Sequence, residues 1–154
     1  MSAASIAALL VRVGLVLLFL PFSALDKIVG FNHAVAQARE VFKPRALAVL
    51  VLLGGLGIEI VCSLGVITGI TDRACAFILA GYCVATAVLY KRFWTQGDFW
   101  SNADGKGRSL FWDFLKNVSL AAGFLVIVVG TQGTGLYRFL DSPLASSHPY
   151  RSTP

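Results

Sequence analysis

Two charged side chains lie inside apolar stretches that are long enough to cross a bilayer. Arg12 is the only charged residue from Ser5 to Leu25, and Glu59 is the only one from Ala46 to Ile70. A charge at the bilayer centre costs about 2.5–3.5 kcal/mol on insertion scales, so each needs a partner or a water-filled cavity. These residues therefore predict a polar site inside a helix bundle, able to hold the head group of a ligand.

Arg12 and Glu59 are predicted to form an ion pair. Counted from the same side of the membrane, Arg12 is about seven residues deep and Glu59 about eleven, a difference of roughly 6 Å along helices with 1.5 Å rise. A long Arg side chain can bridge that difference. Polar contacts also hold membrane helices together, at about 0.6 kcal/mol per hydrogen bond, so the pair fits a ligand site and a structural contact equally well.

A second polar cluster is expected at the opposite ends of these helices. Asp26 and Lys27 end the first stretch, and the fourth stretch begins with Asp113, Lys116 and Asn117. The last three have i, i+3, i+4 spacing and share one helical face. We expect Lys27, Lys116 and Asn117 to meet there, with Lys116 and Asn117 donating hydrogen bonds to a ligand head group or to a partner.

The elements that must position these residues are membrane helices. The chain has 154 residues, 56% of them hydrophobic and 14% charged, against about 25% charged in soluble domains. Four stretches reach the ~17–25 residues that cross the bilayer, at about 5–28, 46–70, 74–90 and 110–130. The sequence predicts an all-α polytopic membrane protein, with one four-transmembrane-helix bundle in residues 1–141.

The two ends of the chain allow other interpretations. The first apolar stretch could be a cleaved signal peptide, but no Lys or Arg precedes it, it exceeds the usual 7–15 residues, and Phe22 disrupts an A-x-A-like site. We expect it to be retained. Residues 142–154 contain three prolines and four serines, which predicts a flexible C-terminal tail unless a partner orders it.

Loop charges predict the orientation. The first and third connections lie on the same face of a four-helix bundle, and they carry eight basic residues: Lys27, Arg39, Lys43, Arg45, Lys91, Arg92, Lys106 and Arg108. The positive-inside rule places this face in the cytoplasm and both termini in the periplasm. We expect a multi-pass protein of the bacterial inner membrane. Its net charge of +5 is read as loop charge facing anionic lipid, so no nucleic-acid partner is expected.

Aromatic residues gather in the third connection, where Phe93, Trp94, Phe99 and Trp100 lie among its charges. Aromatics at the end of a span usually form an interfacial belt. The alternative is a surface that contacts a partner protein, and these four residues are the candidates for it.

Cofactor motifs are not evident in this sequence. Its two histidines, His33 and His148, lie outside the spans and do not form a pair for a haem between helices. Its three cysteines have no zinc or iron–sulfur spacing, so no metal site is predicted. No glycine-rich nucleotide loop is present. Electrons for any redox chemistry would come from a partner or from a diffusible ligand such as quinone.

An ordered set of motifs resembles the DoxX family of small membrane proteins. The stretch from Arg12 to Lys27 is similar to the first helix of that family, and Gly57-Ile-Glu59, followed by Gly65 and Arg73, to its second. Phe93-Trp94, and a last span that opens with Phe114-Leu-Lys116-Asn117 and runs to Gly130, continue the likeness over about residues 10–141.

The resemblance implies a bacterial four-helix bundle associated with redox systems. Some members of the family are subunits of a thiosulfate:quinone oxidoreductase, others join complexes that protect against oxidative stress, and distant eukaryotic relatives are assembly chaperones. The first hypothesis is an accessory subunit of a respiratory or other redox complex that contacts quinone, with Arg12 and Glu59 as the inner site. The alternative is a non-catalytic scaffold or assembly factor for a membrane partner. A proton-coupled transporter is a third option, weakened by the absence of a repeat.

Overall fold

The chain folds into four long helical segments. A computed structural model describes residues 2–100, 104–130 and 134–150. In this part of the chain all regular secondary structure is helical. The segments Ala3–Val29, Arg45–Thr68, Asp72–Thr95 and Lys106–Val129 are long and apolar enough to cross a membrane. The predicted fold class is confirmed, with boundaries that move by a few residues.

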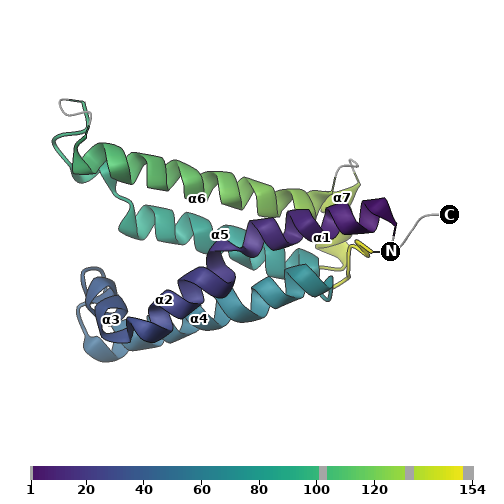
Figure 1. Cartoon of the computed structure of the whole chain (residues 1–154), viewed down its shortest axis with the longest axis horizontal. Helices are drawn as coiled ribbons and strands as arrows, with labels where there is room; N and C mark the ends of the chain where they lie inside the picture. Colours follow the sequence, from purple (N-terminus) through teal and green to yellow (C-terminus); the bar gives the residue numbers. More distant parts are fainter. Residues whose placement is uncertain (1, 101–103, 131–133, 151–154) are drawn as a thin grey trace.

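The first membrane segment is kinked. It consists of α1 (Ala3–Val16), the distorted turn η1 (Leu18–Ser23) and α2 (Ala24–Val29). Leu20 leaves the helical conformation (φ −125°, ψ 112°) just before Pro21, which lacks the N–H that a helix interior needs. As Figure 1 shows, α1 and α2 therefore run in different directions.

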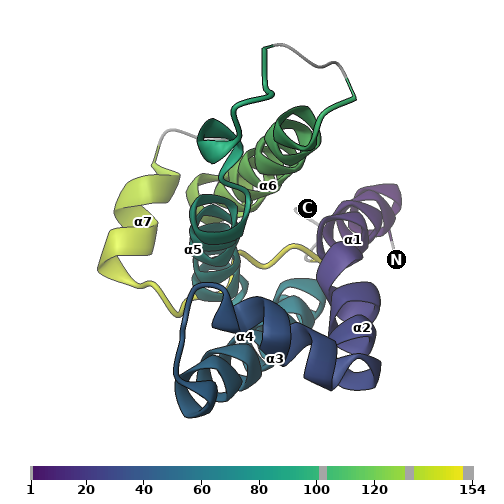
Figure 2. The ribbon, with the colours of Figure 1, turned by 90° about the vertical axis from the view of Figure 1, so that its left-hand side faces the viewer.

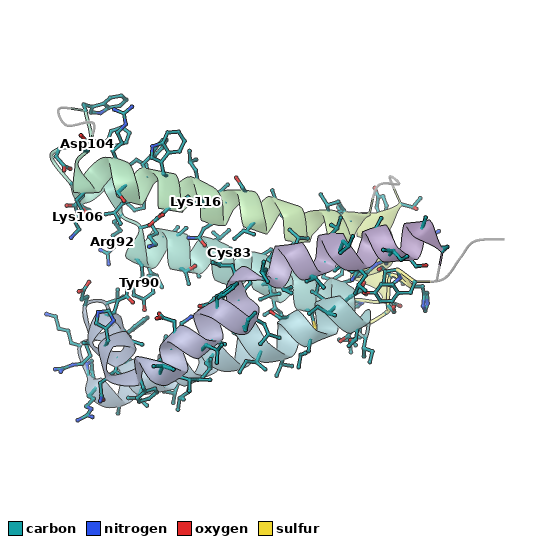
Figure 3. All side chains as sticks on the ribbon, in the orientation of Figure 1. Cys83, Tyr90, Arg92, Asp104, Lys106 and Lys116 are labelled. Atoms are coloured by element: carbon teal, nitrogen blue, oxygen red, sulfur yellow. The ribbon has the colours of Figure 1, made fainter. Side chains whose placement is uncertain are left out.

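The remaining elements complete an up-and-down bundle. They are α3 (Phe31–Arg39), α4 (Arg45–Thr68), α5 (Asp72–Tyr90), η2 (Phe93–Thr95), α6 (Lys106–Val129) and α7 (Gly135–Asp141). In Figure 1 both ends of the chain lie at one end of the bundle, which we call the terminal end. The two long connections lie at the other, the loop end, where Figure 3 labels Arg92 and Lys106. The expectation that both basic connections share one face is thus met.

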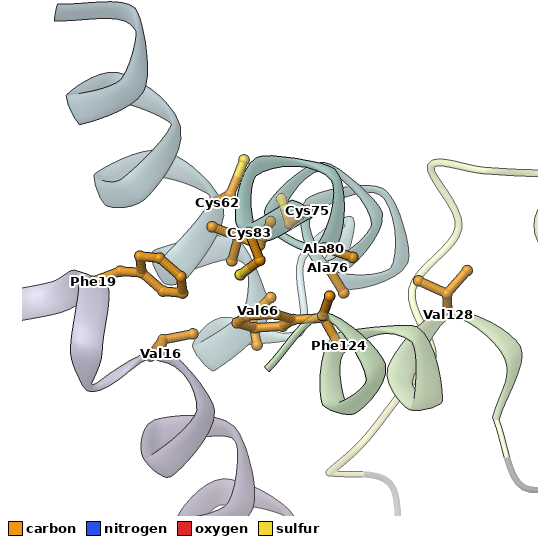
Figure 4. Packing of buried hydrophobic residues seen from close by; sticks show 12 residues of the cluster. Val16, Phe19, Cys62, Val66, Cys75, Ala76, Ala80, Cys83, Phe124 and Val128 are labelled. Carbon is orange, nitrogen blue, oxygen red and sulfur yellow. The ribbon is translucent and has the colours of Figure 1, made fainter. Parts of the chain in front are cut away.

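Apolar side chains from all four segments form the core. Phe19 of η1 contacts Phe124 of α6, with ring centroids 5.9 Å apart, and Val66 of α4 is fully buried between them and α5 (Figure 4). The helices α4 and α5 approach closely at Gly65. A Cβ added at this glycine would lie only 2.4 Å from Cys75 Sγ. Small residues at such crossings are typical of membrane helices.

The C-terminal segment lies against the bundle. After α7 it crosses the terminal end towards α1 (Figure 2), and Ser146 Oγ donates to Gly69 O at 2.6 Å. Tyr150 OH donates to Ile67 O. Up to residue 150, the segment expected to be a flexible tail is thus hydrogen-bonded to the bundle. Its flexibility stays a prediction. Residues 151–154 lie outside the described part.

Candidate functional site

Arg12 forms a buried ion pair with Asp72. Its Nη2 lies 2.7 Å from Asp72 Oδ2, and the two side chains are 8% and 0% exposed. Nη1 donates to Val66 O at 2.8 Å, and Nη2 also donates to Ser147 Oγ at 2.9 Å. Arg12, Asp72 and Ser147 form what we call the terminal cluster, because it lies at the terminal end of the bundle.

The predicted ion pair between Arg12 and Glu59 is wrong. Arg12 is held at the level of Val66, which is seven residues beyond Glu59 and so roughly 10 Å further along α4. The depth comparison treated the first segment as one straight helix, whereas it bends at η1. It also left out Asp72, a nearer carboxylate at the start of α5. Two separate buried ion pairs replace the single predicted one.

The C-terminal segment completes the terminal cluster. Ser147 donates twice to Asp72, from its backbone N to Oδ1 at 2.8 Å and from Oγ to Oδ2 at 2.5 Å. Together with Arg12, these donors occupy both oxygens of the carboxylate. A buried charge that is paired and hydrogen-bonded is stable in an apolar surrounding. The carboxylate of the terminal cluster is thus saturated, which is typical of a structural contact.

Glu59 lies in a second cluster, deeper in the bundle. It is 1% exposed, and its Oε1 accepts hydrogen bonds from Lys27 Nζ at 2.5 Å, Tyr82 OH at 2.8 Å and Ser23 Oγ at 3.1 Å. These donors come from η1, α2 and α5. We call Ser23, Lys27, Glu59, Ser63 and Tyr82 the Glu59 cluster.

This cluster contains two buried polar atoms that are not satisfied. Among the described residues, Glu59 Oε2 and Ser63 Oγ have no hydrogen-bond partner. Ser63 follows Glu59 by four residues, so the two lie on the same face of α4. An unpaired buried polar group costs about 1–3 kcal/mol, and nearly all such groups in proteins have a partner. Glu59 Oε2 and Ser63 Oγ are therefore unmatched polar atoms on one face of α4.

The second predicted cluster does not form as expected. Lys27 turns to Glu59, while Asp113 pairs with Lys91 at 3.1 Å and Lys116 at 3.3 Å. Asn117 Nδ2 donates to Asp113 O on its own helix at 3.2 Å. The kink explains why the expected cluster does not form. After the kink α2 runs beside α4, so at the loop end it lies away from α6 (Figure 1). Lys116 and Asn117 therefore lie apart from both buried ion pairs.

The aromatic candidates form a cluster of their own at the loop end. The Phe93 ring lies 5.1 Å from Trp94, 5.5 Å from Phe99 and 5.0 Å from Phe111, centroid to centroid. The rings of Trp100 and Phe99 pack in a T-shaped arrangement with centroids 4.6 Å apart, and Trp100 is 93% exposed. Phe93 and Phe99 thus support the surface, and Trp94 and Trp100 present it.

The sequence matches one protein family. The family model of DoxX matches residues 7–92, from within α1 to the second residue after α5. The chain belongs to the DoxX family. The part of this DoxX protein that matches includes all four charges of the two buried ion pairs, whereas Ser147 and α6 lie beyond it. No curated protein and no solved structure matches the chain.

Three residues of the DoxX protein's buried clusters were missed by the sequence reasoning. Asp72 was assigned to the short turn between two spans, although a carboxylate at the start of α5 faces the same end of the bundle as Arg12. Tyr82 was not singled out, yet a hydroxyl in mid-span needs a partner. Ser63 carried the clearest signal, since its i+4 spacing from Glu59 places both on one face.

Proposed function

We propose that this membrane protein is an accessory subunit of a respiratory or other redox complex, and that it contacts quinone at the Glu59 cluster. Its setting would be the bacterial inner membrane, with both termini in the periplasm. The observation that carries the proposal is Glu59 Oε2, an acceptor without a partner in the described structure, beside a lysine and a tyrosine at membrane depth.

The hydrogen-bond inventory of the cluster fits a quinone or quinol head group. Lys27 Nζ has three N–H groups and donates to Glu59 Oε1 and to Ser23 Oγ, the latter at 2.6 Å. One donor is left. Glu59 Oε2 remains as an acceptor. A quinone carbonyl can accept from the lysine, and a quinol hydroxyl can donate to the carboxylate, so both redox forms would find a partner.

Membership of the DoxX family supports the redox context. As described above, the resemblance implies subunits of redox complexes, including one that reduces quinone. The two buried ion pairs lie within the part of the chain that matches the family. The two clusters would have different roles. The saturated terminal cluster would hold the helices in position, and the unsaturated Glu59 cluster would bind the quinone head group.

A binding titration tests the proposal. Short-chain ubiquinone and menaquinone analogues are added to the full-length protein in detergent micelles, and binding is followed by quenching of tryptophan fluorescence. We expect Glu59→Gln and Ser63→Ala to weaken binding by about 10-fold, the equivalent of one hydrogen bond to a charged group. Lys116→Gln, on a side chain that is 74% exposed, is the control and should bind as wild type. Equal affinities in all four proteins would refute quinone contact at Glu59.

A scaffold or assembly role is the second candidate, and Trp100 favours it. A tryptophan that is 93% exposed and held by a ring beneath it is typical of a binding hot spot. In this case Phe99→Ala with Trp100→Ala abolishes copurification of a membrane partner, whereas Glu59→Gln mainly lowers thermal stability. Normal copurification of the loop double variant would rule out this role for the aromatic surface.

A further inference from the structure

A polar cavity of about 620 Å³ opens at the loop end of the bundle. It lies between α3, the C-terminal end of α5 with the residues after it, and the start of α6. Its walls include Tyr90, Arg92 and Lys106, which Figure 3 shows at the end of α5 and the start of α6. Tyr90 is the last residue of α5, so the cavity lies where a membrane helix ends and lipid head groups begin.

The charge of this cavity is mainly positive. Lys91, Arg92 and Lys106 line it, against the single carboxylate of Glu40. Lys91 is paired with Asp113. Arg92 donates from Nε to Leu89 O at 3.1 Å, and among residues 2–100, 104–130 and 134–150 it has no ion pair. The first turn of α6 is capped by Asp98 Oδ1, which accepts from Gly107 N at 3.0 Å. An anion would therefore be bound by side chains.

A second, apolar groove lies along α5 and α6, next to the cavity. It also measures about 620 Å³ and is lined by small and branched residues such as Gly81, Val84 and Ala121. Leu89 lines both the groove and the cavity. From Phe77 to Leu89 the groove extends over twelve helical steps of 1.5 Å, roughly 18 Å. This is comparable to one leaflet of a hydrocarbon core ~30 Å thick.

We propose that this site binds an anionic phospholipid, with the phosphate in the cavity beside Arg92 and Lys106 and one acyl chain in the groove between α5 and α6. Basic pockets between membrane helices bind anionic head groups in this way. The groove favours a lipid over a free phosphate ion, because an acyl chain can fill an apolar groove and a free ion cannot. The site is distinct from the Glu59 cluster and does not depend on the proposed function.

Native mass spectrometry of the full-length protein tests the assignment. The protein is released from micelles containing equal amounts of phosphatidylglycerol and phosphatidylcholine with identical chains. We expect the wild type to retain phosphatidylglycerol, and the double variant Arg92→Gln with Lys106→Gln to lose about fivefold in affinity for each basic side chain removed. The matched control is Arg39→Gln with Lys43→Gln, which removes two exposed charges of the same end outside the cavity.

A second pair of variants tests the groove. A side chain added at Gly81 or at Gly57 meets no atom within 4 Å at its Cβ, but only Gly81 lines the groove. Gly81→Leu should lower lipid retention severalfold, while Gly57→Leu keeps it. The thermal transition of every variant is recorded, so that unfolding is separated from loss of the site.

Three results would overturn the proposal. The first is equal retention of both lipids by the wild type. The second is an equal loss in the cavity and control variants. The third is displacement of the bound species by inorganic phosphate together with unchanged retention in Gly81→Leu, which would identify a site for free phosphate instead.

Discussion

The guanidinium of Arg12 and the carboxylate of Asp72 lie 2.7 Å apart, and both side chains are buried. The pair ties α1 to the first residue of α5, and Ser147 ties the C-terminal segment to both. Three parts of the chain that are far apart in sequence therefore meet at one charge pair. Its saturated hydrogen bonding indicates that it holds the terminal end of the bundle together.

Breaking this pair should destabilise the protein strongly. Asp72→Asn leaves Arg12 buried without its counter-charge, and such changes cost about 3–5 kcal/mol. Thermal unfolding in detergent micelles measures the loss. Arg12→Met with Asp72→Leu removes both charges and should cost less than the sum of the single variants. Lys116→Met, at a pair whose lysine is 74% exposed, should change stability by about 0–1 kcal/mol. Additive losses in the double variant would show that the pair contributes nothing.

Ser147→Ala tests the contribution of the C-terminal segment. The variant removes the hydrogen bond from Oγ to Asp72 and the one that Oγ accepts from Arg12. Bonds to charged groups contribute about 1.5–3 kcal/mol each, so the melting temperature should fall and proteolysis after Asp141 should become faster. The exposed Ser119 of α6 provides the control, Ser119→Ala. Identical proteolysis rates in the two variants would mean that Ser147 does not hold the segment.

Gly65→Ala tests the close approach of α4 and α5. The new Cβ would lie 2.4 Å from Cys75 Sγ and 3.2 Å from Ile70 O, and overpacking of this kind costs about 1–3 kcal/mol. Adding Cys75→Ala should recover part of the loss, since it removes the nearest atom. Gly57→Ala places its Cβ in open space and should leave stability unchanged or slightly raised. A Gly65→Ala protein as stable as Gly57→Ala would contradict the packing described for these helices.

The orientation predicted from loop charges can be measured directly. A phosphatase that is active only in the periplasm, fused after Pro154, should be active in a bacterial host, and a fluorescent protein that folds only in the cytoplasm should stay dark at the same position. The reason is the excess of Lys and Arg in the two long connections, which share the loop end of the bundle. The reverse pattern would show that the loop end faces the periplasm.

The sequence was sufficient to predict the fold because membrane helices carry their own signal, in length and hydropathy. The sequence was less informative about which buried charges form ion pairs with each other. Glu59 was correctly identified as a buried charge. Its contact with Lys27 was not predicted, because it depends on the bend at Leu20, which helical periodicity does not show. Asp72 was overlooked because a charge at the edge of a span resembles a loop residue. The contacts of the C-terminal segment were not predicted, because they depend on specific hydrogen bonds of Ser146, Ser147 and Tyr150 that composition does not show.

Quantifying the quinone that accompanies the protein out of its native membrane tests the central claim most directly. Wild type and Glu59→Gln are extracted in mild detergent, and copurifying proteins and quinones are measured by mass spectrometry per chain. We predict that the wild type carries redox subunits and about one quinone, and that Glu59→Gln keeps the subunits but loses the quinone. Equal amounts of quinone in both preparations, or none in either, would contradict quinone contact at Glu59.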